Sequence, residues 1–451
     1  MKTTEGLFLL GVSAVAALGG LLFGFDTAVI SGAIPFIRIY FKLNDIMLGW
    51  TVSSLLIGCI AGVLVSGRPA DIFGRKKTLL VSALLFLVSA AGSASATVLW
   101  VFIVFRFTGG IAVGIASMMS PMYIAEISPA SHRGKLVSLN QLAIVIGILA
   151  AFFSNYLLVD TGLNNWRWML AVMGAPAVLF FASLVFVPES PRWLVQKGKM
   201  DEAFRTLERI SGSSRAREEI SEIRGSLGLR SKSPLREIFS RHMSAVVWVG
   251  IIVAVFQQIT GINSIMYYAP MIFAKTGTGM ESALLQTAAV GAVNLLCTLI
   301  AIRYIDRIGR KPLLIAGTLG MTVSLFALAF AFSQPDREGA IVLGLILFYI
   351  ASFAASLGPV TWVFIAEIYP NRLRGEAMSV AIVVLWSACF LVSLVFPAML
   401  NTLGGGSAFF VFGIMCVLYL VFIIVKVPET KGKSLEELEH LLVSGSEREK
   451  K

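Results

Sequence analysis

The sequence predicts an all-α membrane protein with twelve transmembrane helices, arranged as two six-helix bundles related by pseudo-symmetry. Three observations predict this fold. The chain is 57% hydrophobic and only 14% charged, whereas charged residues make up about 25% of an average soluble protein. Apolar runs long enough to cross a bilayer recur along the whole chain, and the second half repeats the short motifs of the first half.

Two sets of six apolar runs have the length of membrane spans, because a helix needs roughly 20 residues to cross the hydrocarbon layer. The first set lies at about 7–34, 46–66, 78–96, 98–123, 136–158 and 168–187. The second set lies at about 244–273, 282–302, 312–333, 341–366, 376–400 and 408–426. The runs are continuous rather than alternating, so helices that satisfy their own backbone groups are favoured over a barrel.

The motifs of the first half return about 240 residues later. DIFGRK at 71–76 returns as DRIGRK at 306–311, AEISP at 125–129 returns as AEIYP at 366–370, and PES at 188–190 returns as PET at 428–430. Parallel repeats in a polytopic membrane protein are typical of transporters that work by alternating access. In such proteins the substrate lies between the halves near the middle of the membrane.

The basic residues orient the predicted spans. Most of the 37 Lys and Arg residues fall in segments on the same side as both termini, so the positive-inside rule places that side in the cytoplasm. The net charge of +11 therefore describes topology, and nucleic-acid binding is not expected. The expected domains are an N-terminal bundle at 1–187, a cytoplasmic linker with short helices at 188–243, a C-terminal bundle at 244–427 and a cytoplasmic tail at 428–451.

Two ionisable residues fall inside predicted spans, Asp26 in the first and Arg106 in the fourth. A charge at the centre of a membrane helix costs at least ~2.5–3.5 kcal/mol, so such residues normally face a partner or a cavity and are functional candidates. We expect Asp26 and Arg106 to pair. A conformational change that altered their separation would change the proton affinity of Asp26. The alternative is a permanent salt bridge that pins the two helices together.

Uncharged amides and tryptophans also lie within the predicted spans. Amides can hydrogen-bond sugar hydroxyls, and an aromatic face can pack against the C–H side of a sugar ring. The candidates are Gln141, Gln257, Gln258, Asn263, Asn294, Trp362 and Trp386. An interhelical hydrogen bond is the alternative for any single amide, but it does not explain two adjacent glutamines and the concentration of amides in the second half.

Five ordered motifs resemble those of the sugar porters of the major facilitator superfamily. They are GRxxDxxGRK at 67–76, PESPRWL at 188–194, QQxTGxN at 257–263, GPVxW at 358–362 and PETKG at 428–432. The resemblance runs from about residue 15 to residue 440. The stretch GFDTAVISG at 24–32 is most similar to the bacterial proton-coupled xylose and hexose porters.

The resemblance implies the major facilitator fold and a proton-coupled symporter for xylose or for a hexose such as glucose or galactose. Asp26 and Arg106 would couple the proton, because relatives that move sugar without protons carry a neutral residue at the position that matches Asp26. The seven amide and tryptophan positions match the sugar contacts of the family, and Phe23, Tyr267 and Tyr268 would be walls or gates. Leu385 and Ile148 depart from relatives with an amide there, so the choice of monosaccharide stays open.

The repeated motifs predict a cytoplasmic charge network. Its members are Asp71, Arg75, Glu126, Arg133, Glu189, Asp306, Arg310, Glu367, Arg374 and Glu429. We expect Glu126 to pair with the nearby Arg133, Glu367 to pair with Arg374, and the salt bridges to hold the cytoplasmic ends together. Charge that only sets topology is the alternative. Bending points are expected at Gly261 in the seventh span and at Gly358-Pro359 in the tenth.

An enzyme is not expected, because no nucleotide-binding loop, metal cluster or nucleophile triad appears in the soluble segments. The expected partners are a monosaccharide, a proton as the coupling ion and the lipid bilayer, without a cofactor or a metal. A proton is favoured over sodium because a carboxylate beside an arginine is a poor cation cage. We expect a monomer in the bacterial inner membrane. A proton-independent facilitator is the alternative, and a non-transporting sugar receptor is less favoured because the tail is short.

Overall fold

A computed structural model describes residues 3–129, 132–227, 244–334, 339–369 and 374–431. Within these ranges the regular structure is helical, with 11 segments long and apolar enough to span a membrane. The last segment, Gly375–Lys426, holds two helices, α18 (Arg374–Ala398) and α19 (Gly404–Lys426), joined by the π-helix η1 (Met399–Leu403). The chain therefore makes the twelve crossings that the hydropathy predicted.

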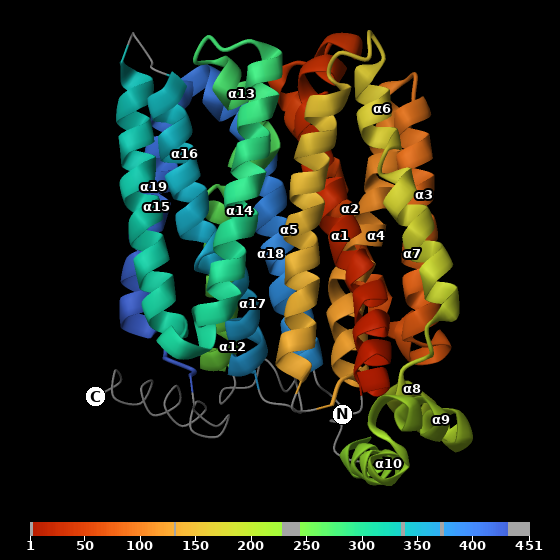
Figure 1. The fold of residues 1–451 in the computed structure, drawn as a ribbon. Helices are drawn as coiled ribbons and strands as arrows, with labels where there is room; N and C mark the ends of the chain where they lie inside the picture. Colours follow the sequence, from red (N-terminus) through yellow and green to blue (C-terminus); the bar gives the residue numbers. More distant parts are fainter. Residues whose placement is uncertain (1–2, 130–131, 228–243, 335–338, 370–373, 432–451) are drawn as a thin grey trace. The chain divides into compact units, whose positions relative to one another are not determined.

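The chain divides into two compact units, and unit 1 contains residues 1–33, 54–154 and 160–230. Its long helices are α1 (Thr3–Tyr40), α2 (Asp45–Phe73), α3 (Arg75–Ser95), α4 (Leu99–Ile127), α5 (Arg133–Leu158) and the consecutive pair α6 (Asn165–Ala171) and α7 (Gly174–Phe186), as Figure 1 shows. The order of these elements follows the first set of apolar runs.

Unit 2 contains residues 34–53, 155–159 and 231–451. Besides α18, η1 and α19, it contains α12 (Ser244–Ile259), α13 (Ile262–Ala274), α14 (Met280–Ile308), α15 (Arg310–Ser333), α16 (Gly339–Ala354) and α17 (Leu357–Ile368). The segments 34–53 and 155–159 are the ends of α1, α2 and α5. These three helices therefore begin or end in unit 2 although most of their length belongs to unit 1.

Two spans of unit 2 are broken near the positions that the sequence indicated. The break between α12 and α13 lies at Gly261, whose φ of 92° is left-handed and suits a residue without a Cβ. The break between α16 and α17 lies at Ala355 and Ser356, just before the expected Gly358-Pro359. The break comes before Pro359 and not at it, because this proline sits in the first turn of α17, where a helix needs no backbone donor.

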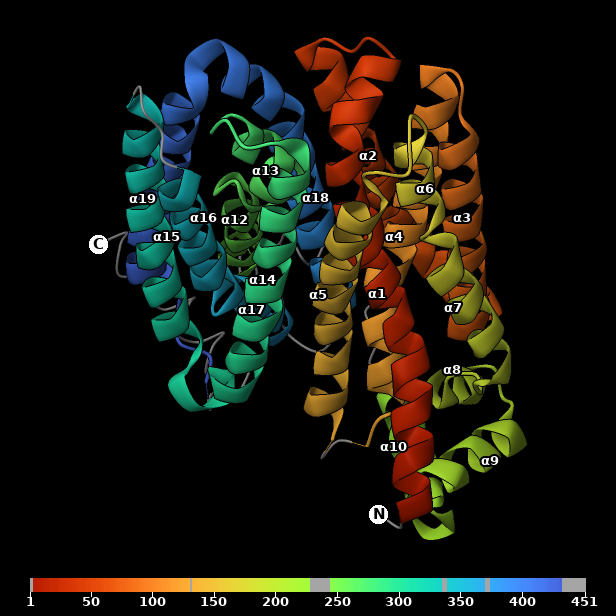
Figure 2. The same ribbon diagram turned by 45° about the horizontal axis from the view of Figure 1, so that its top comes forward.

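The predicted linker contains α8 (Pro191–Gln196), α9 (Met200–Ser211) and α10 (Ser213–Leu227), which lie beyond the end of α7 (Figures 1 and 2). Their small core consists of Trp193, Leu194, Val195 and Ala203, with Met200, Ile220 and Ile223 packed against it. The Arg209 guanidinium lies 4.3 Å from the Phe8 ring centroid, so α9 also contacts the beginning of α1. The rest of the linker, 228–243, and the tail from 432 lie outside the described residues.

Glycines bring α1 and α5 into close contact. A Cβ on Gly24 of α1 would overlap the backbone oxygen of Ile144 on α5, and a Cβ on Gly147 of α5 would overlap that of Leu21 on α1. Small residues at such positions let membrane helices approach closely, which strengthens their van der Waals contact. The helix that carries Asp26 is therefore packed backbone to backbone against the helix that carries Gln141.

Candidate functional site

Asp26 on α1 and Arg106 on α4 form an ion pair in the interior of unit 1, with side-chain exposures of 0% and 1%. Arg106 Nη1 donates to Asp26 Oδ1, and Arg106 Nη2 donates to the backbone oxygen of Asp26 at 3.1 Å. The second contact holds the guanidinium beside α1 independently of the charge on the carboxylate. Asp26 Oδ2 makes no hydrogen bond to any described residue, so this oxygen is the one open to a proton.

Three of the candidate amides form a chain of hydrogen bonds across the break at Gly261. Asn263 Nδ2 donates to Gln258 Oε1 at 2.7 Å, and Gln258 Nε2 donates to Gln257 Oε1 at 3.3 Å. Gln257 Nε2 then donates to the backbone oxygen of Leu357, the first residue of α17, at 3.2 Å. The amides therefore connect both broken spans of unit 2.

Cys389 on α18 joins this cluster, a residue that the sequence analysis did not single out. Asn263 Nδ2 lies 3.2 Å from Cys389 Sγ. Cys389 follows the candidate Trp386 by three residues, a spacing that places both on one face of a helix. That spacing is the signal in the sequence that could have indicated Cys389.

The other candidate sugar residues divide between the two units. Asn294 on α14, Trp362 on α17, Trp386 on α18 and Tyr267 and Tyr268 on α13 belong to unit 2, together with the amide chain. All but Trp362, which is half-buried, are buried. Gln141 on α5 and Phe23 on α1 are half-buried and belong to unit 1. Each unit thus holds part of the predicted set.

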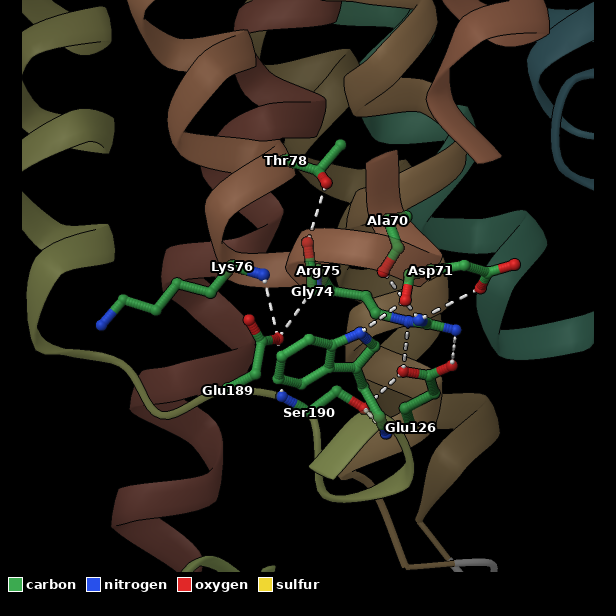
Figure 3. A network of polar contacts seen from close by, with 10 residues as sticks. Ala70, Asp71, Gly74, Arg75, Lys76, Thr78, Glu126, Glu189 and Ser190 are labelled. Atoms are coloured by element: carbon green, nitrogen blue, oxygen red, sulfur yellow. Dashed lines mark hydrogen bonds and ion pairs between the residues drawn. The ribbon is translucent and has the colours of Figure 1, made fainter. Parts of the chain in front are cut away.

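Arg75 lies at the centre of the charge network of unit 1, between the carboxylates of Glu126 and Asp71 (Figure 3). Its Nε lies 2.9 Å from Glu126 Oε2 and its Nη2 donates to Glu126 Oε1 at 3.0 Å, which makes a bidentate pair. Its Nη1 donates to the backbone oxygen of Ala70 at 3.0 Å and lies 3.5 Å from Asp71 Oδ1. The guanidinium therefore ties the end of α2 to the end of α4.

Glu189 caps the beginning of α3 (Figure 3). Its Oε1 accepts the backbone N–H groups of Arg75 at 2.9 Å and Lys76 at 3.0 Å, where a helix leaves donors unpaired. Gly74, with φ of 99°, leaves room for the carboxylate, because a Cβ there would overlap it. Burial raises the pKa of Glu189, and the N–H groups of Ser190, Lys76 and Arg75 oppose that shift.

Unit 2 repeats this arrangement. Arg310 makes a bidentate pair with Glu367, with distances of 2.6 and 3.0 Å, and lies 3.0 Å from Asp306 Oδ1. Glu429 accepts the backbone N–H groups of Arg310 and Lys311, each at 3.0 Å. Burial disfavours the charged form of Glu429, but the N–H groups of Lys431, Arg310 and Lys311 outweigh it and lower the pKa.

The expected pair of Glu126 and Arg133 is wrong. Arg133 Nε instead donates to the backbone oxygen of Ala125 at 3.1 Å, near the end of α4. The cause is that the Arg75 side chain, 8% exposed, is already buried against Glu126, 9% exposed, whereas Arg133 is exposed. Arg374 begins α18, but its side chain lies outside what the structure describes, so the expected pair with Glu367 lies there too.

The ends of α1 and α2 pack against α18 and η1 within unit 2. Asp45 Oδ1 accepts from Arg38 Nη2 at 2.8 Å and from Asn401 Nδ2 at 2.7 Å. The Trp50 and Phe390 rings meet edge to face, and a Cβ on Gly49 would overlap the backbone oxygen of Leu394. This contact lies at the opposite end of α2 from Asp71 and joins the two sequence halves.

The family model for "Sugar (and other) transporter" matches residues 12–442. The chain belongs to this sugar transporter family. It is 41% identical to the D-xylose-proton symporter of Escherichia coli K12, with 96% of each chain covered. It is 40% identical to the arabinose-proton symporter of Bacillus subtilis, with 97% of this chain and 95% of that protein covered. This family accounts for the repeated motifs of the two halves.

The fold is similar to that of a solved member. The partially occluded inward-open structure of the xylose transporter from E. coli has a TM-score of 0.86 and 40% identity, and the match covers 95% of this chain and 100% of that chain. The chain is therefore a multi-pass membrane transporter with the twelve-helix major facilitator fold.

We expect Glu429→Gln and Glu189→Gln to change the melting temperature with opposite pH trends. Because the pKa of Glu429 is lowered, its charge stabilises the fold above the unfolded pKa of 4.5, and this stability is lost as pH falls. Because the pKa of Glu189 is raised, its contribution is present at low pH and lost as pH rises. The measurement compares the melting temperature of each variant in detergent with that of the wild type. From about pH 7 to about pH 4, the amount by which Glu429→Gln melts below the wild type should shrink, and the corresponding amount for Glu189→Gln should grow. Melting-temperature differences that change in the same direction with pH for both variants would contradict this account.

Proposed function

We propose that the protein is a proton-coupled monosaccharide symporter that carries xylose or a hexose such as glucose or galactose by alternating access. The observation that carries the proposal is the buried Asp26–Arg106 pair, in which one carboxylate oxygen bonds the guanidinium and the other is open. A carboxylate in such a place binds or releases a proton when its contact with the arginine changes. The relatives named as proton symporters of xylose and arabinose support the same coupling ion.

Protonation of Asp26 would act on α1 through its partner. It would leave Arg106 as the uncompensated charge, which favours a conformation that gives the guanidinium another partner or water. Because Arg106 Nη2 stays bonded to the Asp26 backbone, α1 and α4 would respond together. The tight contact of α1 with α5 would pass the movement to the helix that carries Gln141.

The sugar would bind to the amides and tryptophans. In the chain from Asn263 to Leu357, Gln257 and Gln258 each donate one bond through Nε2. An amide group has two donors and an acceptor oxygen, so hydrogen-bonding capacity remains for sugar hydroxyls. In unit 2, Asn294 would add a further amide, Trp362 and Trp386 would pack against the ring, and Tyr267 and Tyr268 would form walls. Gln141 and Phe23 are the candidate sugar contacts of unit 1.

The charge networks would brace each half separately. The ion pairs of Arg75 join elements of unit 1, and those of Arg310 join elements of unit 2. Ser190 donates to Glu126, which adds the segment after the sixth span to the network of unit 1. Thr430 donates to Glu367, which adds the segment after the twelfth span to the network of unit 2. Two rigid halves are what alternating access requires, because the halves rock as bodies.

The distribution of Lys and Arg supports a bacterial inner membrane protein with both termini in the cytoplasm. We propose that the monomer is the functional unit and that the proton gradient supplies the energy. No cofactor, nucleic acid or chemical conversion of the sugar is part of this mechanism.

We expect Asp26→Asn to uncouple sugar movement from proton movement. In proteoliposomes, a pulse of xylose, glucose, galactose or arabinose should make the medium alkaline for the sugar that is carried. The variant should lose at least about nine-tenths of that proton uptake, because an amide cannot take up a proton in this pH range, and it should keep sugar counterflow. Asp160→Asn, at an exposed site, is the matched control and should behave like the wild type. Sugar movement without a proton signal in the wild type would instead indicate a facilitator.

We expect Gly49→Leu to block transport while sugar binding persists. The new side chain would overlap the backbone oxygen of Leu394, so the end of α2 could no longer pack against α18. Sugar uptake should fall at least about fivefold, because overpacking of this kind costs about 1–3 kcal/mol. Gly11→Leu, with nothing within 4 Å, is the control. Unchanged uptake by Gly49→Leu would show that the contact is not needed for the transport cycle.

A further inference from the structure

Two buried serines of α3 make none of the hydrogen bonds that serines such as Ser66 and Ser117 make within their helices. Ser89 Oγ and Ser93 Oγ, in residues 0% and 1% exposed, bond no described residue. A serine within a membrane helix normally bonds the carbonyl three or four residues earlier. Ser66 does so to Val63 and Ser117 does so to Gly114, each at 2.9 Å. The hydroxyls of Ser89 and Ser93 are therefore available for another function.

Ser89 lies beside the open oxygen of Asp26. A Cβ on Gly109 of α4 would fall within 2.7 Å of both Asp26 Oδ2 and Ser89 Oγ, so the two oxygens lie near one point. Oxygens this close can be joined by a rotated hydroxyl or by a single water molecule. Arg106 occupies Oδ1, so Oδ2 is the oxygen that faces α3. Because Gly109 has no side chain, both oxygens can lie this close to α4.

Ser93 continues from Ser89 toward the end of α3. Residues four apart share a helix face and are about 6 Å apart along the axis. The helix ends at Ser95, which is exposed. In the proposed orientation this end faces the outside of the cell. The two hydroxyls therefore lie between the outer end of α3 and Asp26.

The charges around these serines come from three helices. Asp26 on α1 and Arg106 on α4 form the pair already described. From α6, Arg167 Nη1 donates to the backbone oxygens of Ala94 and Ala96 at 2.7 Å each, which holds its charge on the carbonyls at the end of α3. α7, which also packs on α3, carries no charged residue. Asp26 is thus the proton-accepting group on this face.

We propose that Ser89 and Ser93 deliver the coupling proton to Asp26 Oδ2 along the contact between α3 and α4, separately from the amide cluster. The inference rests on the proposed function, in which Asp26 is the proton site. Ser93 accepts a proton from a water molecule at the outer end of α3 and gives its own proton to a second water molecule, which bridges the ~6 Å to Ser89 and gives a proton to the Ser89 hydroxyl. Ser89 passes its proton to Oδ2 in the same way, because a hydroxyl both donates and accepts. The products are a neutral carboxylic acid and two unchanged serines.

The test compares Ser89→Ala with Ser82→Ala in proteoliposomes that contain a trapped pH indicator. Ser82 is a matched control, because it is buried on the same helix but its hydroxyl already bonds the backbone oxygen of Ala112 at 2.8 Å. After a sugar pulse, proton uptake by Ser89→Ala should be about tenfold slower than in the wild type. Counterflow should be unchanged, and Ser82→Ala should match the wild type in both. Ser93→Ala should also slow proton uptake, and a lower outer pH should restore part of the rate in both slow variants.

Equal proton uptake rates in Ser89→Ala and Ser82→Ala would overturn the inference. A parallel loss of counterflow in Ser89→Ala and Ser93→Ala would overturn it too, because the serines would then be needed for packing. Asp26→Asn in the same assay separates this inference from the proposed function. If Asp26→Asn abolishes proton uptake and the serine variants do not slow it, only the serine route fails. If Asp26→Asn retains proton uptake, the proton role of Asp26 fails, and the serine route fails with it.

Discussion

The pair of opposite charges in the interior of unit 1 is the constraint on which the account depends. A lone charge within a membrane costs at least ~2.5–3.5 kcal/mol, so Asp26 and Arg106 each need the other. Arg106 also bonds the backbone of Asp26, and this contact would keep the two helices together if the carboxylate were protonated. In the proposed function, protonation of Asp26 would be a local event that the packing of α1 against α4 and α5 would pass to a whole half of the protein.

In the second half, uncharged polar groups inside the membrane also need partners. Breaks in α12–α13 and α16–α17 free backbone groups inside the membrane, and these groups need partners. The amide of Gln257 reaches the first residue of α17, so the broken spans are connected through side chains. Sugar hydroxyls have the same hydrogen-bonding chemistry as these amides. A helix break that is stabilised by amides is therefore a suitable place to bind a sugar and to bend in response to it.

Hydropathy predicted the spans, recurring motifs predicted the two repeated halves, and a glycine within a span predicted the break at Gly261, because each of these signals can be recognised along the sequence. Partners across helices were harder to predict. Arg133 follows Glu126 closely in sequence, yet Arg75 from another helix is the residue that pairs with it. The positions of Cys389 beside Asn263 and of Ser89 beside Asp26 depend on how closely helices approach, which Gly109 in part decides. No pattern within one helix contains that information.

The most direct test of the central claim is the number of protons taken up when the sugar binds. Calorimetry of the detergent-solubilised protein in buffers of different ionisation enthalpy measures that number at each pH. If Asp26 couples the two ligands, wild-type protein should take up a proton with the sugar at pH values where free Asp26 is ionised, and Asp26→Asn should take up none. Sugar binding without proton uptake by the wild type at every pH would contradict the account.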